Sequence, residues 1–102
     1  MEIIDEKNFN EKISKGVVLV DFFATWCGPC RMMAPVLENV KAELGDKVEI
    51  YKVDVDESED LAREYGIMSI PSLYVFVDGQ EKNHSVGFMD KNQVVEMLKA
   101  YL

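Results

Sequence analysis

Two cysteines, Cys27 and Cys30, are the residues whose type and spacing best suit chemistry. Gly28 and Pro29 separate them, and Trp26 precedes the first. Two thiols at this spacing can form a disulfide when the second lies in the first turn of a helix. The unpaired N–H groups and partial positive charge at a helix start stabilise a thiolate, so we expect Cys27 to ionise more readily than a free thiol. The pair is therefore predicted to open and close a disulfide in exchange with other disulfides.

Two other uses of the cysteine pair compete with this one. A closed zinc site needs four ligands, but the sequence offers only these two cysteines and one histidine, His84, which we expect on the surface without a partner. A purely structural disulfide would close so short a loop that it restricts the unfolded chain very little. Both uses fit less well than a redox pair. We therefore predict no metal and no cofactor other than the redox-active disulfide Cys27–Cys30.

The segments on either side of the cysteines predict a strand followed by a helix. Residues 17–23 are apolar and β-branched on both faces, apart from Asp21, as is typical of a central parallel strand. After the cysteines, apolar residues recur at three- and four-residue steps until Gly45, which predicts a helix that ends there. Pro35 lies inside this pattern and should bend the helix, because it lacks an N–H and crowds the carbonyl one turn earlier.

The rest of the chain predicts four more strands and three more helices. We expect the further strands at residues 3–4, 48–55, 72–77 and 81–86. The last two flank a tight-turn pair, Asp78-Gly79, and should form a hairpin. The further helices should begin near Asp5, Glu57 and Asp90, with Asp5 and Asp90 as N-terminal caps.

Strands that alternate with helices imply parallel strands joined by right-handed crossovers. The predicted fold class is therefore α/β, a mixed sheet of about five strands with helices on both faces. A length of 102 residues suits one domain, which we assign to residues 1–102.

Composition and charge narrow the classes of partner. Acidic residues outnumber basic ones by 19 to 11, and the net charge of -8 argues against nucleic acid or an anionic membrane as a partner. The chain opens without a basic and apolar leader, and its apolar runs are far shorter than a membrane span. We therefore expect a cytoplasmic monomer that meets other proteins. The acidic run from Asp54 to Asp60 is interpreted as a solvated cluster at a helix start rather than a metal site.

From about Ile3 to Leu102, the sequence resembles the thioredoxin family. The resemblance rests on VDFFATWCGPCRMMAP, KVDVDE, YGIMSIPSLYVF, DG and VG. It implies the thioredoxin fold and a protein-disulfide reductase that is recharged by a thioredoxin reductase. The implied substrates are proteins that contain disulfides. Two departures are visible: Phe23 stands where many members have Trp, and Met68-Ser69 replaces a common Arg-Gly.

The resemblance also assigns site residues. It makes Cys27 the attacking cysteine and Cys30 the resolving one, with Asp21 as a buried aspartate beside Lys52. It makes Pro71 a cis-proline that faces the disulfide. The implied substrate-docking surface consists of Trp26, Gly28, Pro29, Ile70, Val86 and Gly87.

A carboxylate between Val20 and Phe22 in a central strand is costly unless it has a function or a partner. Burial should raise the pKa of Asp21 toward neutrality, and Lys52 should partly oppose this. Asp21 could then move a proton to or from Cys30. Two plainer interpretations stay open: Asp21 could bond to backbone at a strand end, and Lys52 could be a solvated strand lysine.

Two other functions also stay open. A disulfide oxidase or isomerase of this family favours a histidine between the cysteines, where this chain has Pro29. A pure binding module would grip a partner through Trp26, Ile70 and Gly87 and would not need the cysteines.

Overall fold

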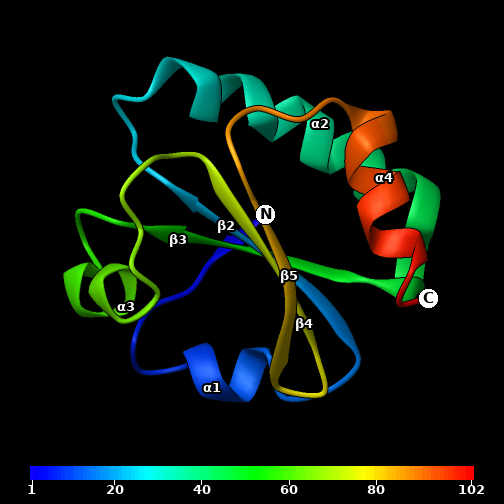
Figure 1. Cartoon of the computed structure of the whole chain (residues 1–102), viewed down its shortest axis with the longest axis horizontal. Helices are drawn as coiled ribbons and strands as arrows, with labels where there is room; N and C mark the ends of the chain where they lie inside the picture. Colours follow the sequence, from blue (N-terminus) through cyan, green and yellow to red (C-terminus); the bar gives the residue numbers. More distant parts are fainter.

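The computed structural model describes residues 1–102, which form a five-stranded sheet with helices on both faces (Figure 1). The strands are β1 (Glu2–Ile3), β2 (Val17–Phe23), β3 (Glu49–Asp54), β4 (Ser72–Val77) and β5 (Gln80–Val86). Their order in the sheet is β1-β3-β2-β4-β5. β3 runs parallel to β1 and β2, whereas β4 runs antiparallel to β2 and β5. The predicted mixed sheet of about five strands, with helices on both faces, is confirmed.

The helices cover the sheet in pairs. They are α1 (Phe9–Lys12), α2 (Gly28–Leu44), α3 (Glu59–Glu64) and α4 (Lys91–Lys99), with a short 3-10 turn, η1 (Gly45–Lys47), after α2. α2 and α4 lie on one face, and α1 and α3 lie on the other (Figure 1). None of the helices is both long and apolar enough to cross a membrane.

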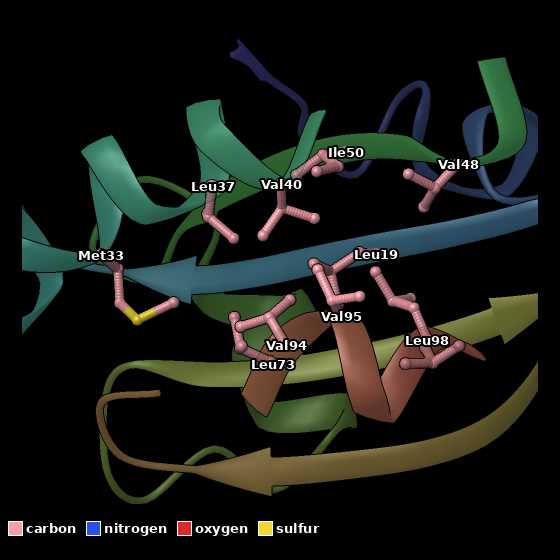
Figure 2. Packing of buried hydrophobic residues seen from close by; sticks show 11 residues of the cluster. Leu19, Met33, Leu37, Val40, Val48, Ile50, Leu73, Val94, Val95 and Leu98 are labelled. Atoms are coloured by element: carbon pink, nitrogen blue, oxygen red, sulfur yellow. The ribbon is translucent and has the colours of Figure 1, made fainter. Parts of the chain in front are cut away.

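Alternation along β2 separates two apolar cores, because successive side chains of a strand point to opposite faces. Leu19 packs under α2 and α4 (Figure 2), whereas Val18 and Val20 pack on the side of α1 and α3. The first core contains Leu19, Met33, Leu37, Val40, Val48, Ile50, Leu73, Val75, Val94, Val95 and Leu98. Asp21 lies two residues after Leu19, so it faces the α2 side as well.

Both ends of α2 follow from its sequence. Cys27 caps the helix, because its Sγ accepts a hydrogen bond of 3.2 Å from the backbone N–H of Cys30. Gly45 ends it with φ of 56°, a conformation that a glycine adopts without a Cβ clash. The helix runs through Pro35, and the bend expected there stays a prediction.

Two predicted helix starts were wrong. α1 begins only at Phe9, and its N-cap is Asn8. The Asp5 carboxylate instead accepts a hydrogen bond from the N–H of Lys7, so it closes a turn before the helix. α3 begins at Glu59 rather than Glu57, because the Asp54 carboxylate holds the preceding N–H groups in a turn.

His84 is exposed on β5 as predicted, but the expectation that it lacks a partner was wrong. Its ring stacks on Tyr74 with the centroids 5.0 Å apart. Its Nδ1 also lies 3.6 Å from a carboxylate oxygen of Glu81.

The predicted capping box of α4 is present. The Asp90 carboxylate accepts a hydrogen bond of 2.9 Å from the Gln93 N–H, and the Gln93 side chain accepts one of 2.9 Å from the Asp90 N–H. We expect Asp90→Ala to lower the free energy of unfolding by about 1 kcal/mol, because it removes the carboxylate that accepts the hydrogen bond from the Gln93 N–H. Urea denaturation would measure the change, with Asp46→Ala at an exposed aspartate of η1 as the control. Equal losses in the two variants would contradict the capping role.

Candidate active site

Cys27 and Cys30 lie where the sheet passes into α2. β2 ends at Phe23, a short loop follows, and Cys27 then caps the helix in which Cys30 occupies the first turn. The two residues form a disulfide with their Cα atoms 5.2 Å apart. Both are buried, with 5% of Cys27 and 2% of Cys30 exposed, so Cys27 is the more accessible of the two. Gly28 and Pro29 are the first two residues of α2, a place where a missing proline N–H breaks no helical hydrogen bond.

The loop before β4 faces this disulfide. The peptide bond between Ile70 and Pro71 is cis, as the resemblance implies. The Ile70 carbonyl oxygen lies 3.9 Å from Cys27 Sγ. The N–H of Gly87 donates a hydrogen bond of 2.8 Å to the Pro71 carbonyl, which holds the end of β5 beside this loop. The chain therefore brings three distant segments around one sulfur.

Exposed apolar side chains lie in the segments that lead into and out of this site. Trp26 is 67% exposed, and Val86, which pairs with Ser72 at the end of the hairpin, is 59% exposed. Met68, just before Ile70 in sequence, is 95% exposed. The indole N–H of Trp26 donates a hydrogen bond of 2.8 Å to the Asp56 carboxylate, which fixes the direction of the ring. Isolated apolar residues are ordinary on a surface, whereas several in neighbouring segments are typical of a surface that binds another protein.

Asp21 is fully buried in the middle of the sheet. Neither of its carboxylate oxygens has a hydrogen-bond partner. Burial therefore raises the pKa of Asp21 from 3.8 to about 7, and the nearby Lys52 ammonium partly opposes this rise. The interpretation in which Asp21 bonds to backbone at a strand end was wrong, because neither oxygen accepts such a bond.

Lys52 is the neighbour of Asp21 across the β2–β3 pair. Its Nζ lies 4.2 Å from the centroid of the Phe23 ring, and no ion pair within 4.0 Å joins it to Asp21. Lys52 is half-buried. Lys52 and Cys30 line one hollow of about 280 Å³, together with Phe23, Ala24, Thr25, Arg31 and Ala34.

A family model described as Thioredoxin matches residues 1–100. The chain belongs to the thioredoxin family. It is 50% identical over 97 residues to thioredoxin of Bacillus subtilis strain 168, covering 95% of this chain and 93% of that protein. It is 48% identical over 99 residues to thioredoxin of Staphylococcus aureus strain Mu50, covering 97% and 95%.

A solved structure confirms the predicted thioredoxin fold. It is an asparagine-to-glutamine mutant of thioredoxin from Halobacterium salinarum NRC-1. The two structures superpose with a TM-score of 0.89 at 33% sequence identity, and the match covers 99% of this chain and 88% of that one. Membership in this family, together with the Cys27–Cys30 disulfide, makes the chain a thiol–disulfide oxidoreductase of the protein-disulfide reductase type. The redox group of a thioredoxin is its own cysteine pair, and no further cofactor takes part.

Three neighbours of the thioredoxin site were not predicted as such. Phe23 was noted only as a departure from Trp, although its place two residues after Asp21 puts it on the same face of β2. Asp56 was assigned to a solvated cluster, and no local pattern links it to Trp26. Arg31 lines the hollow beside Cys30, and its guanidinium donates a hydrogen bond of 3.1 Å to the Thr25 carbonyl.

Proposed function

We propose that this chain reduces disulfides of other proteins, with Cys27 as the attacking residue and Cys30 as the resolving residue. The observation that carries the assignment is the position of Cys27 Sγ at the N-terminus of α2, where it accepts the N–H of Cys30. That hydrogen bond and the helix dipole favour a thiolate on Cys27 once the disulfide is open.

In the reduced protein, the Cys27 thiolate attacks one sulfur of the target disulfide. This step forms a mixed disulfide and expels the other target sulfur as a thiolate, which takes up a proton. Cys30 then loses its proton and attacks Cys27 Sγ, which forms the Cys27–Cys30 disulfide and releases the second target sulfur. Two electrons pass from the cysteine pair to the target, and a thioredoxin reductase returns two electrons to complete the cycle.

Cys30 must lose its proton before it can attack, and we assign this step to Asp21. The carboxyl is buried on the side of β2 that faces α2, the helix that carries Cys30. Its pKa of about 7 lets it exist in both protonation states near neutral pH, as a proton carrier must. We assign Lys52 to the same step, as the charge that moderates the proton affinity of Asp21.

We propose that target proteins dock on the surface formed by Trp26, Gly28, Pro29, Ile70, Pro71, Val86 and Gly87. The Ile70 carbonyl beside Cys27 supports this, because an extended target segment can pair with exposed backbone there. A reductant needs a continuing supply of electrons, so we propose that the chain works in a reducing compartment, the cytoplasm, as a monomer of one domain over residues 1–102.

Val86→Asp tests the docking surface. A charge at this exposed apolar site should raise KM for a protein disulfide by about tenfold, because the target must desolvate it on docking. The rate at which a small dithiol reduces the Cys27–Cys30 disulfide should not change, since a small molecule does not cover Val86. Kinetics with a protein substrate and with the dithiol would separate the two effects.

Leu102→Asp is the matched control, because Leu102 is 47% exposed and lines a hollow with Leu44 at the far end of α2. That variant should keep the original KM. A docking surface elsewhere would be indicated if Val86→Asp and Leu102→Asp behaved alike.

A further inference from the structure

Asp21, Phe23 and Lys52 share one face of the sheet. Asp21 and Phe23 are two residues apart in β2, so their side chains point the same way, toward α2. Lys52 pairs with Asp21 from β3, and Ile50, two residues before Lys52, packs in the core under α2. The three side chains therefore meet below the first turn of α2, where Cys30 lies.

The Lys52 ammonium occupies a specific place in this group. It lies 4.2 Å from the Phe23 ring centroid, well inside the range of about 6 Å over which a ring face attracts a cation. Phe23 is itself 6% exposed and packs with Ala24, Cys27 and Cys30, so its ring offers a fixed platform. Lysine has a long flexible stem and a strongly hydrated charge, so without such a platform the ammonium gains by moving into water.

Other charged or titratable groups near Asp21 do not replace this ammonium. From α2, Cys30 is uncharged in the disulfide, and Arg31 is exposed and held by the Thr25 carbonyl. From β4, the register neighbour of Asp21 is Leu73, which carries no charge. Lys52 is the charge that lowers the proton affinity of Asp21, and its effect falls as the ammonium moves away.

We propose that Phe23 is a positioning residue, whose ring retains the Lys52 ammonium beside Asp21 and thereby sets how readily this carboxyl takes the proton of Cys30. The effect on proton transfer from Cys30 rests on the function proposed above for Asp21. The choice of aromatic residue at position 23 then tunes the proton affinity of Asp21, because the face of Trp attracts a cation more strongly than that of Phe.

The test is a series at one position, Phe23→Leu and Phe23→Trp, compared with the original chain in the oxidised state. The disulfide does not titrate, so a carboxyl-carbon NMR titration follows Asp21 without coupling to the thiols. We expect the proton affinity of Asp21 to rise about threefold in Phe23→Leu, in which the ring is lost, and to fall in Phe23→Trp.

The Lys52→Met background is the matched control, because it removes the charge and keeps a long apolar stem. In this background, Phe23→Leu and Phe23→Trp should leave the Asp21 titration where Lys52→Met alone puts it. Phe23→Trp still tests the proposal if the smaller leucine side chain of Phe23→Leu disturbs the packing around the cysteines. The proposal is overturned if the titration is the same across the series, or if the shifts persist without Lys52, since the ring would then act through burial alone.

The rate of protein-disulfide reduction against pH gives the second readout. Its midpoint should move in the same order as the Asp21 titration, with Leu above Phe and Phe above Trp. If the NMR titration follows the series and the rate does not, Phe23 positions Lys52 but the proton role of Asp21 fails. If Asp21→Asn alters the rate profile and the NMR titration ignores the ring, the positioning role fails alone.

Discussion

Replacement of Cys27 by serine is expected to lower the rate of protein-disulfide reduction roughly 10³-fold or more, because a serine hydroxyl is not ionised near neutral pH and no second group can attack in its place. Cys30 cannot substitute, since it is 2% exposed and lies on the inner side of α2. Turnover of an insulin-like disulfide, with a dithiol as electron source, measures the loss.

Cys30→Ser is the informative companion to this variant. It keeps the first attack and loses only the resolving step, so it should react once and then stall. Thermal unfolding of the two serine variants would show whether both keep the fold. Residual turnover in Cys27→Ser close to that of the original chain would show that the reaction does not begin at Cys27.

Asp21→Asn is expected to make the protein more stable above neutral pH and less active. The pKa of Asp21 is about 7 in the folded chain and 3.8 when the group is unperturbed. Between these two pH values, the folded state therefore holds a proton that the unfolded state has lost. Stability therefore falls as the pH rises from about 4 to 7, and the whole penalty is present above 7. The difference corresponds to about 4 kcal/mol at pH 8.

Asparagine has nearly the same shape and no charge, so it removes this penalty at high pH and changes little at pH 4. Urea denaturation of the oxidised protein at pH 4, 6 and 8 would give the free energy of unfolding of both chains. The gain from Asp21→Asn should grow across this range, while Asp46→Asn, at an exposed site, should show no such trend. Parallel pH dependences in the original chain and Asp21→Asn would contradict the raised pKa of Asp21.

The same substitution should slow reduction near neutral pH, because Cys30 loses the acceptor for its proton. The rate should also lose its pH dependence around pH 7. A protein that gains stability and loses activity by one change is what a buried carboxyl kept for proton transfer predicts.

Local pattern was enough to predict the elements that hold the cysteines. β2 spans Val17–Phe23 as expected, since this run is apolar and β-branched on both faces apart from Asp21, which is typical of a central strand. α2 ends at Gly45 because glycine there can take the positive φ that ends a helix. The start of α1 was missed because Asp5 can cap a helix or close a turn, and the same sequence pattern fits both.

Contacts between neighbouring strands and between loops could not be predicted from local sequence pattern. The position of the Lys52 ammonium over Phe23 depends on the register of β2 with β3, in which Asp21 pairs with Lys52 and Phe23 with Asp54. A shift of that register by one residue would turn Lys52 to the opposite face of the sheet. The bond from Trp26 to Asp56 likewise needs the loops after β2 and β3 side by side, which only the folded sheet provides.

Trapping of the mixed disulfide tests most directly that Cys27 attacks and Cys30 resolves. Reduced Cys30→Ser would be mixed with a protein that carries one accessible disulfide, and the products would be separated without reductant and mapped by mass spectrometry. The expected product is a covalent one-to-one adduct through Cys27, absent with Cys27→Ser and released by added dithiol. No adduct with Cys30→Ser, or an adduct that forms equally well with Cys27→Ser, would contradict the proposed roles of the two cysteines.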